Sequence, residues 1–268
     1  QEFFPSGFEK SAKDLNEARR VLSMFIPKAF RRPLKAGEID IYLGLFQKQV
    51  SLGNDFAEAL RVSMTAVLCS PDFLYIFEPN KSGKKRKLSE HELASRLSFF
   101  LWSSMPDSKL VSKASKGELK DKAALKKEVD RLLGDVKSDR FYDGFVSEWL
   151  KIHEFDNFEP DEHIYKEYHK NHNKGIDEDM KQEPISFLKE IIDSNASMLA
   201  CLKSDWTMLN ERLANFYGIK GVSGQEFRKV KVPKDSHRGG LLTMAGFHKW
   251  GSDGNRTKPV ERGKYVLD

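Results

Sequence analysis

The sequence is poor in cysteine, with only Cys69 and Cys201 among its 268 residues. It contains no C-x-x-C pair and no C-x-x-C-H motif. These absences exclude the usual zinc ribbons, thioredoxin-like dithiols and covalent haem attachment within the chain itself. Both cysteines stand among apolar residues, where cysteine ordinarily behaves as a small hydrophobic side chain. Two such cysteines do not decide between an oxidising and a reducing compartment.

The sequence also lacks an apolar run of the 18 residues that suggest a membrane-spanning helix. No signal peptide is visible, but the chain starts at Gln1 rather than Met, which leaves open a leader that has been removed. Motifs of self-contained enzymes are missing: there is no G-x-S-x-G, no S-x-x-K with its partner motifs, no P-loop and no G-x-G-x-x-G. We therefore predict no transmembrane segment and no complete active site in these residues.

Charge of one sign is in small excess. The net charge is +5, and most of it is spread thinly along the chain. The exception is "KSGKKRK" at residues 81–87, whose cations could contact phosphate or an anionic membrane. This run has glycine and serine but no interleaved aromatic residue, and it separates two apolar segments, which favours a solvated linker. We predict no nucleic-acid binding.

Helical periodicity is what the sequence has in abundance. Apolar residues recur at steps of three and four over residues 15–29, 39–50 and 56–68, which is the spacing of amphipathic helices. None of these helices can bury its stripe alone, so the three should pack as a small bundle. The alternation typical of a strand occurs only in "FRKVKV" at 227–232. The predicted fold class is all-α, with two packed helical modules and the start of a third, loop-rich helical module.

Helix signals also predict how the chain is divided. Ser89 and Glu92 have the spacing of a capping box, which should start the central helix of a larger domain. Further helices are expected at 121–133, 138–151, 176–193 with a kink or break at Pro184, and 207–217 with a cap at Gly218. The predicted domains are a small helical bundle (1–79), a basic linker (80–87), a larger helical domain (88–218) and the truncated start of a third, arginine-loop module (219–268).

A histidine-rich segment, "DEHIYKEYHKNHNKGIDED" at 161–179, provides the only candidates for metal binding. His169 and His172 have the i,i+3 spacing that puts two ligands on one helix face. The segment is rich in lysine and asparagine and has little apolar support, so it lacks the packed surroundings that hold metal ligands in place. We interpret it as a solvated connector and predict no metal site.

Arg96 is a cation on an otherwise apolar helix. Its guanidinium group has to reach water or pair with a carboxylate. We predict a buried structural ion pair, with Glu183 or Glu190 as the partner. The alternative is that Arg96 faces a ligand.

The candidate binding site lies in "HRGGLLTMAGFHKWGSDGNRTKPVERGKYVLD", residues 237–268. Gly254 should form a tight loop, Pro259 is well placed to open the next helix, and Gly263 is a further structural candidate. Such a loop would present arginines to an anion such as a carboxylate or a propionate. The alternative is a plain corner between helices whose arginines bind carbonyls and neighbouring acids. No catalytic residue is assigned; the candidate binding residues are His237, Arg238, Arg256 and Arg262.

Several segments together resemble a known multidomain family. They are "AFRRPLKAGEIDIYLGLF", "LSEHELASRLSFFLWSSMPDSKL", "SDWTMLNERLANFYGI" and the block 237–268 just quoted. The family is abundant in planctomycetes and related bacteria, and its consecutive modules are known only as domains of unknown function. The resemblance runs in order from about residue 14 to 268. Asp253 and Lys258 depart from the family signature S-N-G-x-R-T-S-P-V-x-R-G, whereas Arg256 and Arg262 match it.

The resemblance implies a context for the chain. Members of the family typically continue into a proline-rich stretch and a C-x-x-C-H motif for haem c, and they are exported. On this basis no cofactor is expected within this chain, and covalent haem is expected in a following part. The implied partners are the neighbouring haem module of the same polypeptide and a periplasmic redox partner or polysaccharide, and the implied location is the periplasm or cell envelope.

Three hypotheses about function follow. The first is a helical, non-haem portion of an exported cytochrome-c-linked protein with a redox or electron-transfer role. The second is a cell-envelope scaffold or a module recognising glycans or proteins without catalysis, which an exposed cluster of Trp102, Trp206 or Trp250 would favour. The third is a hydrolase whose site is divided between modules. Whether the chain is part of an enzyme stays open.

Overall fold

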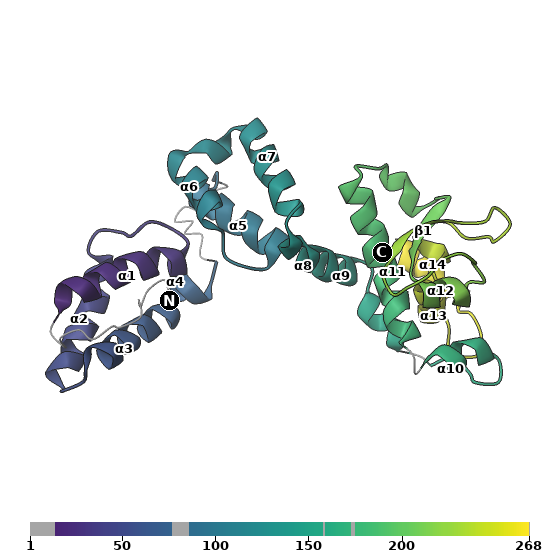
Figure 1. Ribbon diagram of the computed structural model, residues 1–268, viewed down its shortest axis with the longest axis horizontal. Helices are drawn as coiled ribbons and strands as arrows, with labels where there is room; N and C mark the ends of the chain where they lie inside the picture. The colour runs from purple at the N-terminus through teal and green to yellow at the C-terminus, as the bar shows by residue number, and fades with distance from the viewer. Residues whose placement is uncertain (1–13, 77–85, 158, 173–174, 268) are drawn as a thin grey trace. The chain divides into compact units, whose positions relative to one another are not determined.

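The computed structural model describes residues 14–76, 86–157, 159–172 and 175–267. Over these residues the chain is mostly helical, with one small two-stranded sheet (Figure 1). The prediction of an all-α fold is therefore confirmed, with the sheet as an addition. The chain forms two compact units, Gln1–Leu132 and Leu133–Asp268. The division into the four predicted segments stays a prediction.

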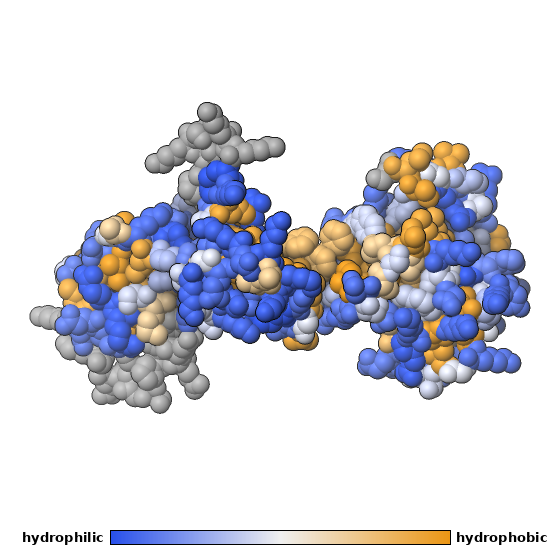
Figure 2. Space-filling model, turned by 90° about the horizontal axis from the view of Figure 1, so that it is seen from above, coloured by the Kyte–Doolittle hydropathy of each residue, from blue (hydrophilic) through white to orange (hydrophobic). Residues whose placement is uncertain are grey.

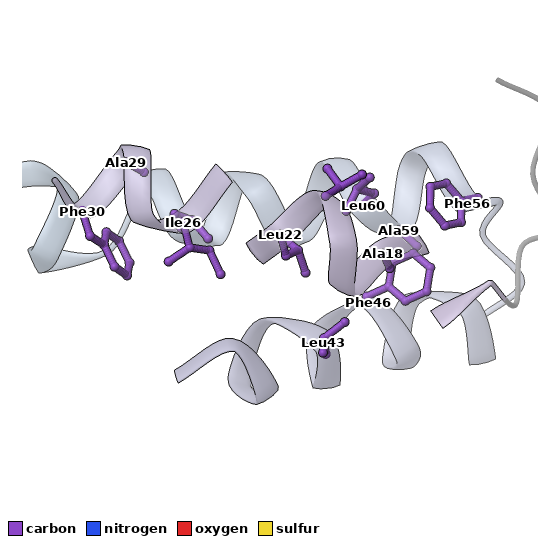
Figure 3. Packing of buried hydrophobic residues seen from close by; sticks show 12 residues of the cluster. Ala18, Leu22, Ile26, Ala29, Phe30, Leu43, Phe46, Phe56, Ala59 and Leu60 are labelled. Carbon is purple, nitrogen blue, oxygen red and sulfur yellow. The ribbon is translucent and has the colours of Figure 1, made fainter. Parts of the chain in front are cut away.

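Three helices form a bundle at the start of the first unit, as their apolar stripes predicted. They are α1 (Leu15–Phe30), α2 (Glu38–Ser51) and α3 (Phe56–Leu68). Their apolar side chains meet between the helices, as Figure 3 shows, and the rings of Phe46 and Phe56 pack edge to face with centroids 5.2 Å apart. The buried core consists of Ala18, Val21, Leu22, Ile26, Ala29, Phe30, Leu43, Phe46, Phe56, Ala59, Leu60 and Val67.

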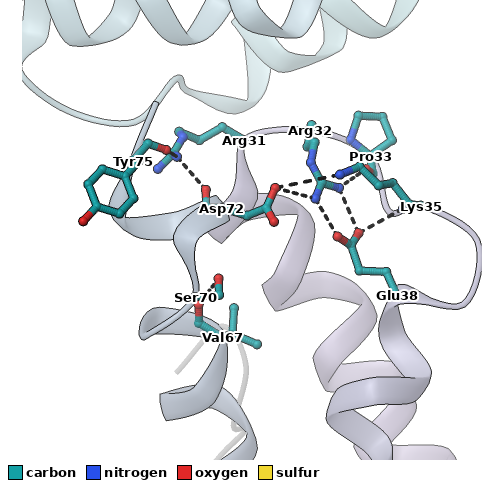
Figure 4. A network of polar contacts seen from close by, with 9 residues as sticks. All are labelled: Arg31, Arg32, Pro33, Lys35, Glu38, Val67, Ser70, Asp72 and Tyr75. Carbon is teal, nitrogen blue, oxygen red and sulfur yellow. Dashed lines mark hydrogen bonds and ion pairs between the residues drawn. The ribbon is translucent and has the colours of Figure 1, made fainter. Parts of the chain in front are cut away.

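Two adjacent arginines fasten the short helix α4 (Pro71–Leu74) to this bundle (Figure 4). Arg31 has left-handed backbone geometry after α1 and donates hydrogen bonds to three backbone carbonyl oxygens in and just after α4. Arg32 pairs with the carboxylates of Glu38 and Asp72 at 2.5 and 2.9 Å. Planar guanidinium groups suit such multiple contacts. These cations therefore have a structural role.

The predicted capping box starts α5 (Glu90–Trp102). The Ser89 hydroxyl accepts a hydrogen bond from the Glu92 N–H at 3.3 Å, and the Glu92 carboxylate accepts one from the Ser89 N–H at 2.7 Å. Arg86 also binds Glu92, and this contact is the main reason that the pKa of Glu92 falls to about 2. Of the predicted basic linker, Arg86 and Lys87 are described, and residues 80–85 lie outside the described residues.

The first unit is completed by α6 (Ser108–Lys116), the 3₁₀ turn η1 (Glu118–Lys120) and α7 (Lys122–Leu133). The buried carboxylate of Glu90 accepts hydrogen bonds from two backbone N–H groups in η1. Trp102 is buried, and its indole N–H donates to a backbone carbonyl near the end of α7 at 2.8 Å. These two buried polar groups tie α5 to later elements of the unit.

The prediction that Arg96 forms a buried ion pair is wrong, because Arg96 is exposed on α5. The carboxylates proposed as partners are bound elsewhere. Glu183 accepts hydrogen bonds from two hydroxyl groups, and Glu190 pairs with Lys229. A long arginine side chain can reach water from an amphipathic helix. The apolar residues next to Arg96 in the sequence had suggested that it was buried.

The second unit begins with a helical stretch that contains a π-helical turn. Its pieces are α8 (Asp139–Phe141), η3 (Tyr142–Val146) and α9 (Ser147–Trp149). Aromatic residues at four-residue spacing form a ladder along it: the rings of Phe141 and Phe145 stack at 5.2 Å, and those of Phe145 and Trp149 at 5.9 Å.

The helix α11 (Ile176–Asp193) crosses the second unit. A kink or a break was predicted at Pro184; the helix is not broken there, since it continues through this residue, and the kink stays a prediction. Proline has no N–H, so the carbonyl of Met180 cannot receive the usual helical hydrogen bond from position 184. The apolar side chains of α11 bury themselves in the unit, and that packing holds the helix together across the proline.

The sheet is a finding that the sequence predicted only in part. Strand β2 (Arg228–Lys231) lies in the predicted segment, and it pairs antiparallel with β1 (Trp206–Leu209). Residues 207–209 were expected to be helical, so that prediction is wrong, and the helix α12 (Glu211–Phe216) starts only after the Asn210 cap. The left-handed cap at Gly218 is present, with φ of +72°.

The second unit also contains shorter elements. They are η2 (Val136–Ser138), η4 (Ile152–Asp156), α10 (Lys166–His172), η5 (Met198–Cys201), η6 (Leu241–Thr243), α13 (Ala245–Trp250) and α14 (Pro259–Leu267). Of these, η4, α10, η5 and α13 contact α11. One buried cluster joins α10, α11, β1 and α12 through Tyr168, Ile176, Met180, Leu209, Leu213, Ala214 and Ile219.

Hydrophilic residues cover most of the face seen in Figure 2, with smaller hydrophobic areas between them. Among the described residues, no helix is both long and apolar enough to cross a membrane. This finding agrees with the expectation from the sequence.

Candidate functional site

The candidate site is built on a glycine-containing loop between α13 and α14. Gly254 has φ of +93°, and a Cβ at this position would lie 2.6 Å from the carbonyl oxygen of Glu159. The Gly254 carbonyl in turn accepts a hydrogen bond from the Asp161 N–H at 2.8 Å. Only glycine combines this backbone geometry with so close an approach. The loop is therefore held against the segment before α10, and Pro259 opens α14 as predicted.

This loop borders a cavity of about 300 Å³ in the second unit. Four of its lining side chains carry nitrogen: Arg238, His248, Lys249 and Arg262. Its remaining walls are mainly aromatic, apolar or loop backbone, contributed by Pro160, Tyr165, Tyr168, Met180, Phe216, Ala245, Ser252, Gly254 and Thr257. A concave site with apolar walls and a few convergent polar groups is typical of a small-molecule pocket.

Arg238 is held in a fixed orientation at this cavity. Its guanidinium carbon lies 3.6 Å from the centre of the Tyr217 ring, and one of its nitrogens donates to the Thr243 carbonyl at 3.0 Å. Stacking and a single backbone hydrogen bond leave further N–H groups of the planar guanidinium to bind a ligand. Among the described residues no carboxylate forms an ion pair with Arg238, so stacking and one hydrogen bond orient its guanidinium group.

Arg262 reaches the cavity from the first turns of α14. Its side chain passes over Gly251, where a Cβ would come within 2.4 Å of the arginine Cγ. Its guanidinium group lies 3.5 Å from the Thr257 hydroxyl. The absence of a side chain at Gly251 therefore allows Arg262 to lie along the loop toward the cavity.

The other two nitrogen-bearing side chains contribute less positive charge. Lys249 binds the carboxylates of Asp177 at 2.5 Å and Asp156 at 3.3 Å, so its charge is balanced. Partial desolvation and then the guanidinium groups of Arg262 and Arg238 lower the pKa of His248. A histidine with a lowered pKa is mainly neutral at pH 7. The positive potential of the cavity therefore comes from the two arginines.

A buried acid lies behind the Arg238 wall. Glu183 is 1% exposed, and its carboxylate accepts hydrogen bonds from the hydroxyls of Thr207 at 2.7 Å and Tyr217 at 2.5 Å. Burial raises the pKa of Glu183 to about 7, although both hydrogen bonds and the charge of Arg238 oppose the rise. The Tyr217 oxygen also accepts a hydrogen bond from the Ala245 N–H at 2.8 Å. One tyrosine therefore connects the buried acid with the cavity wall.

The structure brings together two of the four predicted binding residues, Arg238 and Arg262. His237 is exposed, has φ of +52° and does not line the cavity. Arg256 is exposed and binds Asp253 within its own loop at 3.3 Å. Of the four predicted binding residues, two therefore line this cavity and two lie outside it; their role in binding stays a prediction.

A second cavity, of about 310 Å³, adjoins the same loop and shares Arg262. Pro259 and Gly263 line it together with aromatic side chains from α13 and α14. No side chain lies within 4 Å of where a Cβ would stand on Gly263, so the structural role predicted for this glycine does not rest on close packing.

The prediction from the sequence did not include Glu183, Tyr217 and His248 in the candidate site. A signal for Glu183 existed, because it falls on the apolar stripe of Ile176, Met180 and Phe187 at helical spacing. A carboxylate on a buried stripe needs partners, and such partners often mark a functional site.

The histidine candidates for metal binding have other contacts or cannot be placed. His169 forms a hydrogen bond through Nε2 with the Pro160 carbonyl at 2.5 Å. The side chain of His172 lies outside the described residues. Among the residues that the structure describes, no group of three or more histidine, cysteine, aspartate or glutamate side chains could hold a metal ion.

The tryptophans named as a test of the scaffold hypothesis do not form an exposed cluster. Trp102 is 1% exposed. Trp206 packs against Phe187 and beneath Lys229 on the sheet, whereas Trp250 donates a hydrogen bond to Glu154. Each of the three therefore has its own structural surroundings.

The fold and the cavity define a mainly helical protein with a cationic pocket. Residues 88–219 match the family model described as PSD4, protein of unknown function (DUF1592). Residues 17–78 match the one described as PSD5, protein of unknown function (DUF1595). The chain thus contains two consecutive domains of unknown function, as the resemblance predicted. Neither the search of the curated proteins nor that of the solved structures returned a match.

Proposed function

We propose that this chain is the non-haem, anion-binding part of an exported cytochrome-c-linked protein with a redox role. The cavity at Arg238 and Arg262 would hold a carboxylate attached to an aromatic or apolar body. In the polypeptide, that carboxylate would come from the neighbouring haem module or from a periplasmic substrate. The family resemblance supports the redox context, and the cavity supports the anion.

The observation that carries this proposal is the placement of two guanidinium groups on one cavity of about 300 Å³. Guanidinium groups bind carboxylates through paired, charge-assisted hydrogen bonds. Tyr165, Tyr168 and Phe216 offer apolar surface for the rest of such a ligand. A cavity of this volume is at the small end of the range for ligand sites, which suits a carboxylate on one ring or a short chain.

The haem itself would have to belong to another module. Covalent haem c needs two cysteines and a histidine in one short motif. Cys69 and Cys201 are far apart in the sequence, and no C-x-x-C-H motif is present. The residues of this chain therefore do not fit covalent haem, and their proposed task is to bind and orient the anionic group.

Calorimetric titration of the chain with benzoate tests the proposed pocket. Replacing either Arg238 or Arg262 by glutamine should weaken binding about 10- to 100-fold, as expected for loss of a hydrogen bond to a charged group. Arg256→Gln is the matched control, because Arg256 is exposed outside the cavity, and it should bind benzoate as the wild type does. Equal affinities for all four proteins would contradict the proposed site.

The redox role needs a separate measurement, in the polypeptide that includes the haem module. Arg262→Gln should shift the haem midpoint potential or loosen the association of the two modules, because it removes positive charge near the docked group. An unchanged potential and an unchanged melting curve would reject the redox part of the proposal, even if benzoate binds.

A second candidate function is recognition of a partner or a glycan by the aromatic ladder of α8 to α9. Phe145 and Trp149 are stacked on each other and are 45% and 49% exposed. Exposed aromatic faces of this kind suit stacking against a ring of a partner. Trp149→Ala should abolish retention on an immobilised polysaccharide if this function holds, and retention equal to the wild type would rule it out.

A further inference from the structure

A single side chain joins the buried acid to the pocket. The hydroxyl of Tyr217 lies between the Glu183 carboxylate, to which it donates, and the Ala245 N–H, from which it accepts. The face of the same ring carries the guanidinium group of Arg238 at 3.6 Å. Ala245 and Arg238 both line the cavity. The Tyr217 side chain therefore lies between the Glu183 carboxylate and the proposed anion site, and Glu183 is on the side of this ring away from the cavity.

The charged groups around Glu183 leave Arg238 as its cationic neighbour. Four cations on or near α11 pair with other acids: Arg212 binds Asp179, Lys249 binds Asp177 and Asp156, Lys229 binds Glu190, and Lys189 binds Asp139. Asp143 on η3, which also packs against α11, has a raised pKa caused first by burial. The groups facing Glu183 directly are the hydroxyls of Thr207 on β1 and Tyr217 after α12, together with the charge of Arg238. His248 on α13 faces the cavity.

This arrangement sets two negative charges in competition for one arginine. An anion in the pocket would approach Arg238 from the cavity, while the Glu183 carboxylate already interacts with it from the buried side. Like charges near each other in a water-poor site repel strongly, and the usual outcome is that one of them takes up a proton. The bound anion is the more exposed of the two, so the buried acid is the one to be protonated.

We propose that the pocket binds its anion together with a proton, and that Glu183 is the group that takes up this proton. The inference rests on the proposed anion binding and deepens it. The proton comes from the solvent and adds to one carboxylate oxygen, and no covalent bond other than this O–H bond forms. The carboxyl group then becomes a donor, so the hydroxyl of Thr207 or Tyr217 has to turn to accept from it.

The linkage is reciprocal, which makes it measurable from both sides. Lower pH should tighten anion binding, and a bound anion should raise the pKa of Glu183. Burial has already raised that pKa to about 7, and a bound anion should raise it further, so the effect should begin near pH 7 and extend above it. In that range the apparent affinity should rise by up to about tenfold for each unit of decreasing pH, the limit for one proton.

His248 is the competing group for proton uptake, because it lines the cavity and would become charged by accepting a proton when an anion binds. Its pKa is lowered, so its contribution should appear below that of Glu183 on the pH scale. The variants Glu183→Gln and His248→Gln distinguish which of the two groups takes up the proton. Glu190→Gln is the matched control on the same helix, since Glu190 is partly exposed and paired with Lys229.

The test is calorimetric titration of the full chain with benzoate at pH 7.5 in Tris, bis-Tris and imidazole, whose ionisation enthalpies differ. The dependence of the observed enthalpy on the buffer gives the number of protons taken up. The wild type, His248→Gln and Glu190→Gln should all take up part of one proton. Glu183→Gln should take up none, and its affinity should be nearly constant from pH 7 to 8. Uptake that persists in Glu183→Gln would overturn the inference.

A measurement on the wild type covers the case in which Glu183→Gln does not fold. Carbon-13 NMR of the Glu183 carboxyl group gives its titration midpoint with and without saturating benzoate. The midpoint should be at a higher pH with benzoate, and equal midpoints would overturn the inference. If the wild type binds no benzoate at any pH, the proposed pocket fails and the inference fails with it; binding without movement of the midpoint rejects the inference alone.

Discussion

The α1–α3 bundle and the second unit bury different kinds of side chain. In the bundle, the buried residues are apolar apart from Arg31 and Ser63, and Arg31 is bound to backbone carbonyls. The second unit encloses Asp179, Glu183, Thr207 and Asn210, which bind one another or nearby cations and hydroxyls. Buried polar groups cost stability unless all their partners are in place. The bundle therefore contains few buried polar groups that lower stability. The second unit contains several, and some of them lie beside the candidate pocket.

The largest effect should come from the bundle core. Phe46 is 1% exposed and packs against Phe56. Phe46→Ala should lower the free energy of unfolding by about 3–5 kcal/mol, because it removes apolar contacts and leaves a cavity. Urea denaturation followed by circular dichroism measures this loss. A change below about 1 kcal/mol would contradict the description of the bundle as the tightly packed region.

The next effect distinguishes the second unit by its pH dependence. The ordinary pKa of glutamate in the unfolded chain is 4.5, and that of Glu183 in the fold is about 7. The folded state therefore binds more protons between these values, so its stability is full below pH 4.5 and falls as pH rises to 7. The loss is about 3 kcal/mol by linkage. Glu183→Gln should remove this slope from the urea unfolding curves, and Glu190→Gln should keep it.

A smaller effect is expected in the loop of the pocket. Gly254→Ala places a Cβ at a positive φ and against the Glu159 carbonyl, which should cost about 1–3 kcal/mol. Gly263→Ala is the control, since nothing lies within 4 Å of its added carbon, and it should be neutral or slightly stabilising. Thermal unfolding and benzoate affinity together report the difference. Equal losses in both variants would show that the loop does not depend on this close approach.

The smallest effect concerns the start of α5 in the first unit. Ser89→Ala removes the side-chain oxygen that accepts from the Glu92 N–H, and it should cost about 1 kcal/mol. Benzoate affinity should be unchanged, because the pocket is built entirely from the second unit. A loss of affinity in this variant would mean that the two units are coupled in binding.

The bundle was predictable because its information is local. Apolar residues at steps of three and four specify a helix and its buried face at once, and Ser89 with Glu92 marks a helix start within four residues. The strand β1 was not, because its partner β2 lies some twenty residues later and no local pattern distinguishes it from the start of α12. Strand pairing is a tertiary effect that overrides local preference.

The loop beside the candidate pocket was predictable because glycines and a proline mark it in the sequence, and Arg238 and Arg262 flank this region. Arg256 could not be separated from Arg262 by sequence, since both flank the same proline. Which one lines the cavity depends on Gly251, over which the Arg262 side chain passes. Glu183 was concealed in a charged stretch, and its burial depends on hydroxyls contributed by β1 and by the end of α12.

Pro184 affects how closely α13 can pack against α11. Without an N–H at this position, the Met180 carbonyl does not receive the usual helical hydrogen bond, and its oxygen lies close to a neighbour on α13. That neighbour is Gly246, whose added Cβ would stand 3.0 Å from this oxygen and 2.3 Å from the ring of Phe155. The proline on α11 and the glycine on α13 thus act together to allow this close contact. Anyone transplanting the Arg238 pocket onto a different scaffold would have to carry both along.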